Sequence, residues 1–258
     1  MIRKFPEAPF VSISDHQRMP LPNANWLGTV QHGLPDDLFR PSYDRGSYLA
    51  FLGRLTAEKG PEDAIRIARA AGKPLCIAAK IPRAETAFFR KHLEPHLDGD
   101  RVQLIGEVDD ARKQPFLADA AALLFPINWP EPFGLVMIEA MACGTPVIAY
   151  RSGSVPEVVE DGITGFIVES EEEAVAAVNE LARLDRRTIR ARFEERFSAR
   201  RMVREYEGLY QKLIAAGAAE AAGGKYHLKC EKICNDVQGG DGYGIGPSAL
   251  VDRLSGPT

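Results

Sequence analysis

Short apolar runs alternate with amphipathic segments between about residue 48 and residue 168 of the chain. The runs are brief and almost entirely apolar, as expected of strands that are covered on both faces of a parallel sheet. The predicted strands are Tyr48–Leu52, Leu75–Ala79, Val102–Ile105, Ala122–Phe125 and Pro146–Ala149. The segments between them have helical periodicity, so the pattern predicts an α/β, Rossmann-like parallel sheet with helices on both faces.

Two of the helices between these strands have clear start signals. Pro61 suits the first position of a helix, because its missing N–H would have no partner there. Asp109 and Asp110 begin another helix, whose apolar stripe includes Phe116 and Leu117, since carboxylates are stabilised at a helix N-terminus.

The segments on either side of the sheet have other patterns. Phe10–Ile13 is predicted to be a short strand, and Trp26–Val30 is a second short apolar piece; both are typical of the remnant of another layer. After residue 170 the pattern becomes helical and charged, with nine arginines from Arg183 to Arg204. This favours a helical face exposed to solvent, and the alternative is a contact with an anionic membrane or a partner.

The composition changes again in the last part of the chain, to Gly, Asp, Lys and Cys with no period. Such a segment buries little apolar surface and predicts a disordered tail. The expected divisions are a remnant of another domain with a linker at 1–45, a Rossmann-like domain at 46–185, C-terminal helices at 186–222 and the tail at 223–258.

Composition and charge limit the classes of protein that fit. The 258 residues are 45% hydrophobic, which suffices for one ordinary core but not for two large domains. A net charge of −4 argues against general binding to nucleic acid. The sequence has neither an apolar run of about 18 residues nor a signal-peptide start. We therefore expect a cytoplasmic protein, with peripheral contact at the inner face of a membrane as the alternative.

The first candidate site follows the first strand of the predicted sheet. Gly53 and Gly60 bound a loop that contains Arg54 and Lys59. Ligands of an open parallel sheet bind beyond the carboxyl ends of its strands, and a guanidinium and an ammonium there would suit a diphosphate. The alternative is that Arg54 forms a surface ion pair with Glu58 and that the glycines only make turns.

The second candidate site follows the strand that ends at Phe125. An aromatic, proline-rich loop leads into a helix expected to start near Leu135, and the backbone N–H groups at Gly134–Val136 would offer an anion site at the same edge of the sheet. Glu131 lies in the loop and Glu139 in the helix, and a carboxylate suits two adjacent sugar hydroxyls. The neighbours of Glu139 are apolar, so this acid needs a partner.

Two stretches of sequence carry a resemblance to a known family. They are Gly-Arg-x-x-x-Glu-Lys-Gly at 53–60 and, about 70 residues later, Glu-Pro-Phe-Gly-Leu-Val-x-x-Glu-Ala-Met-Ala-x-Gly-x-Pro-Val-Ile-Ala at 131–149. Together they resemble the family 4 glycosyltransferases of the GT-B fold. The resemblance covers about residues 30–168, which would be the donor-binding, C-terminal half of that fold.

The resemblance implies roles for particular residues. Arg54 and Lys59 would hold the diphosphate of the donor and, with Glu131 at the donor sugar, form the catalytic set. Glu139 would accept the ribose hydroxyls. Val108, with Asp110 near it, would lie beside the base of the nucleotide, and Ile81 would lie on the other side of the base. The implied donor-binding residues, in full, are Gly53, Ile81, Val108, Asp110, Phe133, Gly134, Leu135, Val136 and Glu139.

The resemblance also implies the chemistry. The donor would be a nucleoside diphosphate sugar, most commonly of the UDP type, and no cofactor and no metal would be required. A hexosyl group would pass to a carbohydrate or lipid-linked acceptor with retention at the anomeric carbon. Cations and amides would stabilise the departing diphosphate.

The family pattern includes a second, N-terminal domain that supplies the acceptor site. The sequence before residue 46 resembles only the closing strand, helix and linker of such a domain. We therefore expect a glycosyltransferase that needs a missing N-terminal acceptor domain for activity. Two alternatives stay open: a module that binds a nucleotide sugar without transferring it, and a GT-B epimerase that acts on the nucleotide sugar itself.

Overall fold

The computed structural model describes residues 5–222 of the chain. Contacts group the chain up to Gln211 into one compact unit and the chain from Lys212 onward into a second. The predicted tail at 223–258 lies outside the described residues. Within residues 5–222, no helix combines the length and the apolar character that crossing a bilayer requires.

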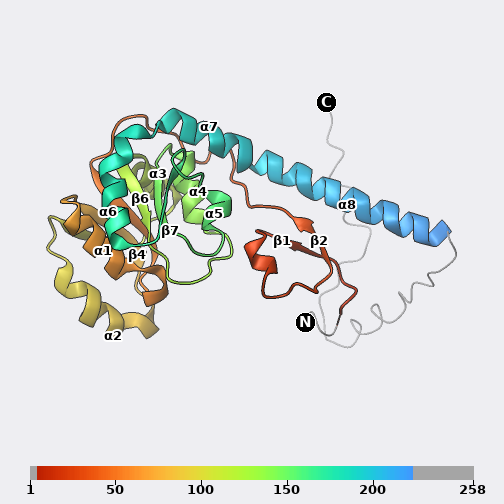
Figure 1. Ribbon diagram of the computed structural model, residues 1–258, viewed down its shortest axis with the longest axis horizontal. Coiled ribbons are helices and arrows are strands. Elements are labelled where there is room, and N and C mark those ends of the chain that lie inside the picture. Colours follow the sequence, from red (N-terminus) through yellow and green to blue (C-terminus); the bar gives the residue numbers. More distant parts are fainter. Residues whose placement is uncertain (1–4, 223–258) are drawn as a thin grey trace, which may run out of the picture. The chain divides into compact units, whose positions relative to one another are not determined.

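The centre of the first unit is a six-stranded parallel sheet in the order β5-β4-β3-β6-β7-β8 (Figure 1). Its strands are β3 (Tyr48–Arg54), β4 (Leu75–Lys80), β5 (Val102–Gly106), β6 (Ala120–Phe125), β7 (Val147–Tyr150) and β8 (Gly165–Val168). The five predicted strands are all confirmed. The sixth, β8, is missing from the prediction because it is short and begins with a glycine. A Cβ built at Gly165 would overlap the carbonyl oxygen of Val147, so glycine lets β8 approach β7 closely.

Helices cover both faces of this sheet, as predicted (Figure 1). Successive residues of β6 alternate between two core clusters, with Leu123 and Phe125 in one and Ala122 and Leu124 in the other. The first cluster includes residues of α3, α4, α5 and α7, and the second includes residues of α1 and α6. The helices are α1 (Pro61–Ala70), α2 (Thr86–Phe88), α3 (Asp110–Ala118), α4 (Leu135–Ala142), α5 (Val155–Val158), α6 (Glu171–Glu180), α7 (Arg186–Arg196) and α8 (Ala199–Ala222).

The two apolar pieces that precede the sheet form a separate small sheet. Strands β1 (Phe10–Ser12) and β2 (Trp26–Thr29) pair in parallel with each other and with no strand of the larger sheet. The carboxylate of Glu157, in α5, accepts the backbone N–H groups of Asp15 and His16 at 2.8 Å each. This carboxylate therefore ties the segment after β1 to the larger sheet's domain.

The arginine-rich segment differs at two positions from the expectation of a solvated helical face. Arg186 and Arg190, both in α7, are each only 8% exposed. Arg186 donates hydrogen bonds to the carbonyl oxygens of Ser42, Ala118 and Ala120 and to the hydroxyl of Thr145. Arg190 donates to the carbonyl oxygens of Asp36, Phe39 and Ala142. These buried guanidinium groups fasten α7 to the linker before β3 and to the ends of other elements.

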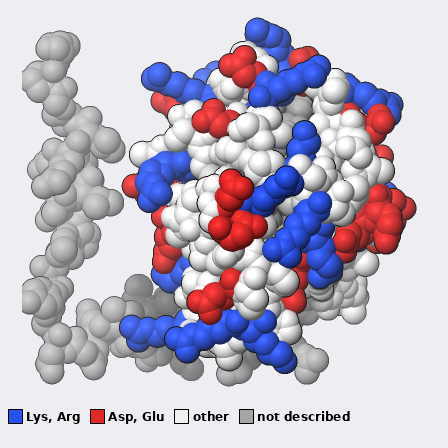
Figure 2. All heavy atoms as spheres, turned by 90° about the vertical axis from the view of Figure 1, so that its left-hand side faces the viewer, with Lys and Arg blue, Asp and Glu red and all other residues white. Residues whose placement is uncertain are grey.

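The charges of the described surface are mixed in sign. On the face that Figure 2 shows, Lys and Arg residues are interspersed with Asp and Glu residues. Several of the remaining arginines form exposed pairs within a helix, such as Arg192 with Glu195 at 2.9 Å. Pairs of this kind contribute little to stability, about 0.3–0.5 kcal/mol each.

Candidate functional site

The two predicted motifs meet at the carboxyl edge of the sheet, because β3 and β6 are neighbouring parallel strands. One loop follows β3 at residues 55–60, and the other follows β6 at residues 126–134. The backbone N–H of Asn128 donates to the carbonyl oxygen of Glu58 at 2.9 Å. The side-chain amide of Asn128 donates to the carboxylate of Asp63 at 3.0 Å. Asn128 thus joins two loops that lie about 70 residues apart in the sequence.

Gly60 lets these loops approach each other. Its φ is +70°, in the left-handed region that favours glycine, and it directly precedes Pro61, the first residue of α1. A Cβ built on Gly60 would overlap the carbonyl oxygen of Pro126. A side chain at this position would therefore force the β3 and β6 loops apart.

Lys59 and Glu131 contact each other directly. The ammonium of Lys59 forms an ion pair with the Glu131 carboxylate, and the two side chains are 16% and 14% exposed. The indole N–H of Trp129 donates to the same carboxylate at 3.0 Å, and the Lys59 ammonium lies 4.9 Å from the centre of the Trp129 ring. Two of the three residues of the implied catalytic set therefore form one buried cluster.

Arg54 is an exposed cation at the same edge. Its guanidinium lies 3.6 Å from the Glu58 carboxylate, so the surface ion pair considered as the alternative is present. The Arg54 side chain is 61% exposed. Because an exposed ion pair is weak, this pair leaves Arg54 able to turn to a phosphate.

The loop after β7 holds the Glu131 segment in place, a function that the sequence did not reveal. The Ser154 N–H donates to the carbonyl oxygen of Glu131 at 2.9 Å, and the Ser154 hydroxyl donates to that of Phe133 at 2.9 Å. A Cβ built on Gly153 would overlap the backbone of Glu131. The available signal was a glycine followed by a serine just after a strand, at the edge where the other motifs lie.

Helix α4 begins at Leu135, as predicted, and Gly134 before it has a φ of +80°. The N–H groups of the first helical turn have no partner inside the helix, so those at Leu135 and Val136 can donate to an anion at this edge. Phe133 fixes the approach to the helix, because its buried ring packs edge-to-face on His32 and Phe197, with centres 5.0 and 6.1 Å away. The packing of the Phe133 ring therefore holds the segment that leads into α4.

Glu139 lies in α4 and is only 8% exposed. The partner that its apolar surroundings require is Lys113 of α3, whose ammonium donates to Oε1 at 2.8 Å. Oε2 is buried and has no hydrogen-bond partner among the described residues. A buried acceptor without a partner is rare in folded proteins, so Oε2 is a candidate acceptor for the hydroxyl groups of a ligand. No local sequence pattern indicates that Lys113 faces Glu139.

The residues expected at the base of the nucleotide lie just after strands β4 and β5. Ile81 follows β4 and Val108 follows β5, and the side chains of Lys80 and Glu107 pair at 3.3 Å between the two strand ends. Ile81 packs against one core cluster and Val108 against the other. The structure therefore brings the two segments to the same edge of the sheet, where the two side chains pack against different core clusters.

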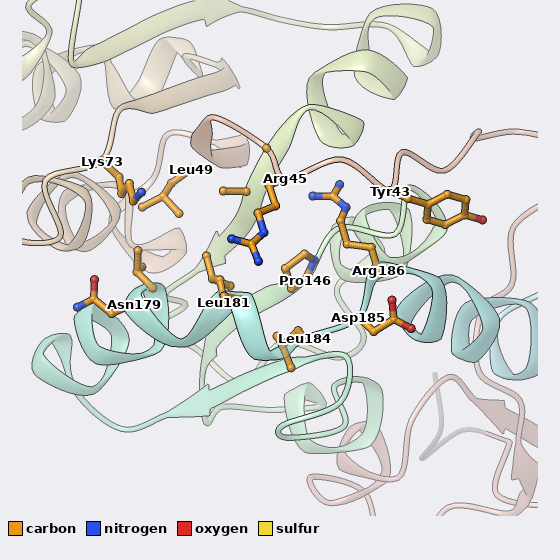
Figure 3. Close-up of a pocket in the computed structure, with 14 residues that line it drawn as sticks. Tyr43, Arg45, Leu49, Lys73, Pro146, Asn179, Leu181, Leu184, Asp185 and Arg186 are labelled. Carbon is orange, nitrogen blue, oxygen red and sulfur yellow. The ribbon is translucent and has the colours of Figure 1, made fainter.

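A cavity of about 380 Å³ lies at the opposite edge of the sheet. Its lining residues Arg45, Lys73 and Pro146 precede β3, β4 and β7, and others belong to the turn between α6 and α7. Figure 3 shows Arg45 extending into it beside Pro146 and Leu181. Because ligands of an open parallel sheet bind at the carboxyl ends of the strands, this cavity is not part of the candidate site. Within residues 5–222, no three His, Cys, Asp or Glu side chains gather as metal ligands would.

His32, which packs on Phe133, makes stability depend on pH. Burial, and next the nearby charge of Arg201, lower the pKa of His32 from its usual 6.5. Between the two pKa values the unfolded chain binds a proton that the folded chain does not, so stability is lost as the pH falls below 6.5. We expect the melting temperature to fall between about pH 7.5 and about pH 5, and to fall less in a His32→Gln variant. Equal falls in the two proteins would contradict this assignment.

A parallel sheet that is covered by helices on both faces defines an α/β domain of the doubly wound, Rossmann-like type. Residues 39–199 match the family model of glycosyl transferases group 1, so the chain belongs to this family. It is 33% identical over 123 residues to N-acetyl-alpha-D-glucosaminyl L-malate synthase of Bacillus anthracis, covering 45% of this chain and 32% of that protein. It is 30% identical over 167 residues to D-inositol 3-phosphate glycosyltransferase of Mycobacterium leprae, covering 55% of this chain and 36% of that protein. The chain thus spans about a third of the length of these curated relatives.

Solved structures show the same fold. AviGT4, a glycosyltransferase involved in avilamycin A biosynthesis, superposes with a TM-score of 0.66 at 24% identity, covering 80% of this chain and 64% of that one. Sucrose-phosphate synthase of Thermosynechococcus elongatus gives 0.69 at 24% identity, covering 81% and 59%. Anabaena Alr3699/HepE in complex with UDP-glucose gives 0.69 at 19% identity, covering 83% and 66%. The family and the GT-B fold expected from the sequence are therefore confirmed.

Proposed function

We propose that this chain binds a nucleoside diphosphate sugar at the carboxyl edge of its sheet and forms the donor half of a retaining hexosyltransferase. The observation that carries the proposal is the buried carboxylate of Glu139. Its Oε1 accepts a hydrogen bond from Lys113, and its Oε2 has no hydrogen-bond partner among the described residues. Glu139 lies one turn into the helix whose N-terminus would hold the phosphates. A UDP-type donor is supported by HepE, a protein of the same fold described in complex with UDP-glucose.

Transfer of the sugar leaves negative charge on the departing diphosphate. Arg54 can bind phosphate oxygens with both arms of its guanidinium, and the α4 amides add donors and the positive end of a helix dipole. Lys59 would share its charge between Glu131 and the phosphate. The α4 amides are held in place by the helix before the reaction, which is how electrostatic catalysis lowers a barrier. We propose that Arg54, Lys59 and the α4 amides suffice without a metal ion.

Glu131 would face the donor sugar. Its carboxylate forms an ion pair with Lys59, and the hydrogen bond from the Trp129 indole fixes its direction. A sugar hydroxyl that donates to Glu131 would weaken its pairing with Lys59 and free the ammonium for the diphosphate. Binding of the sugar and binding of the phosphates would then favour each other.

The acceptor is an unidentified carbohydrate or lipid-linked molecule, and we propose that a second, N-terminal domain supplies its site. The alternative is a module that binds the donor without transferring it. Donor binding with neither transfer nor hydrolysis would favour the module. Transfer that appears when an N-terminal domain from a relative is added would favour the transferase.

The donor site is tested by calorimetric titration with UDP, GDP and ADP, and then with their sugar conjugates. We expect Arg54→Ala, Lys59→Ala and Glu139→Ala each to weaken nucleoside diphosphate binding by about 1–3 kcal/mol, as for loss of a hydrogen bond to a charged group. Arg45→Ala is the matched control, because Arg45 is exposed and lines the cavity at the opposite edge. Unchanged affinity in all three site variants would refute the site.

A further inference from the structure

Lys113 connects two helices of the candidate site and is not among the residues that the sequence implied. Its ammonium lies 2.8 Å from Oε1 of Glu139 in α4 and 3.2 Å from Oδ1 of Asp110 in its own helix. The centre of the buried Phe39 ring is 5.9 Å away. One cation therefore bridges the carboxylate expected at the ribose and the carboxylate expected near the base.

The bridge is firmly charged. Burial by itself would lower the pKa of Lys113, but the hydrogen bonds and charges of Glu139 and Asp110 raise it above its ordinary value. The Lys113 and Glu139 side chains are 17% and 11% exposed, so the ion pair lies mostly out of contact with solvent. An ion pair with this much burial is held in one geometry, because separating its members leaves a charge without a partner.

We propose that Lys113 is a positioning residue for the nucleotide, which holds Glu139 so that Oε2 alone faces the ribose hydroxyls. The inference rests on the proposed function, since it takes Glu139 to be the ribose ligand. Helix α3, which contains Lys113, begins at Asp110, two residues after Val108. Lys113 therefore also couples the contact between Glu139 and the ribose to the position of the Val108 segment, which is expected at the base.

The physical reason is preorganisation. Lys113 holds Oε1, so the Glu139 side chain needs no further ordering when the nucleotide binds. Among the described residues, Oε2 has no hydrogen-bond partner that a ribose hydroxyl would have to displace. Without the ammonium, Glu139 would turn to other donors or bind water, and the hydroxyls would have to displace them. The loss would fall on the ribose contact and not on the phosphates, which Arg54 and the α4 amides would bind.

The test compares two ligands across variants of the full 258-residue chain. The ligands are whichever of UDP, GDP and ADP binds most tightly and its 2′,3′-dideoxy form, titrated by calorimetry into the wild type, Lys113→Gln and Lys113→Arg. Lys73→Gln is the matched control, because Lys73 is exposed and lines the cavity at the opposite edge. Thermal unfolding of each variant reports whether it is folded.

We expect Lys113→Gln to weaken binding of the ribonucleotide about tenfold and of the dideoxynucleotide less than about twofold. Lys113→Arg, which keeps the charge with a different shape, should lie between the wild type and Lys113→Gln in its preference for the ribonucleotide. Lys73→Gln should behave as the wild type. If Lys113→Gln does not fold, the Lys113→Arg variant provides the same comparison of ligands.

Two outcomes would overturn the inference. Equal weakening of both ligands would show that Lys113 only maintains the fold, and an unchanged preference for the ribonucleotide would show that Glu139 does not need it. Failure of the proposed function gives a different result: a wild type that binds the two ligands equally well would remove Glu139 from the ribose altogether.

Discussion

Replacing Arg186 with methionine is expected to lower the free energy of unfolding by about 3–5 kcal/mol, one of the larger effects a single substitution can have. Methionine would fill part of the space but donate nothing to the three carbonyl oxygens and the Thr145 hydroxyl that the guanidinium now satisfies. The loss is partly offset, because burial of the cation is itself costly, as the lowered pKa of Arg186 indicates. Urea unfolding followed by circular dichroism measures the difference.

Arg183→Met is the matched control for this substitution. Arg183 lies three residues before Arg186, but its side chain is 73% exposed and forms an ion pair with Glu180 at 3.0 Å. We expect its free energy of unfolding to stay within about 0.5 kcal/mol of the wild type. If Arg186→Met were as mild as Arg183→Met, water entering from the cavity that Arg186 lines would be replacing the lost donors.

The parts of the fold that the sequence predicted depend on local patterns of burial. The apolar run of β6 supplies both core clusters in alternation, so it could be recognised as a covered strand without knowledge of its neighbours. The start of α4 was predictable because Gly134 precedes an apolar helical segment. Strand β8 was not predicted, because it begins with Gly165 and a glycine is typical of a turn. The glycine is needed there because the backbone of β8 approaches Val147 closely.

The polar contacts between distant segments have no comparable local signal. The apolar neighbours of Glu139 showed that it needs a partner, yet Lys113 lies 26 residues away and nothing in its own surroundings indicates the pairing. The contacts of Arg186 and Arg190 are even harder to predict from the sequence, because these side chains bind backbone carbonyl groups, which every residue has. An arginine that binds such acceptors has the same sequence pattern as one on a solvated face.

The carboxyl-edge site itself depends on a close approach of two loops, and Gly60→Ala is expected to disrupt it. Alanine at a φ of +70° costs about 1–2 kcal/mol, and the overlap of its Cβ with the Pro126 carbonyl adds about 1–3 kcal/mol. The loops can relieve this overlap only by separating, which would break the hydrogen bond between Asn128 and Glu58. We therefore expect both a loss of stability and weaker nucleoside diphosphate binding, measured by urea unfolding and calorimetry.

Gly72→Ala separates the two causes, because Gly72 has nearly the same φ, +64°, but no atom within 4 Å of a built Cβ. It should lose only the backbone contribution of about 1–2 kcal/mol and bind the nucleotide as the wild type does. The extra loss in Gly60→Ala then measures the contact between the loops. Equal losses of stability in the two variants, with normal nucleotide binding in both, would mean that the β3 and β6 loops adjust freely. In that case the donor site would not depend on the close approach at Gly60.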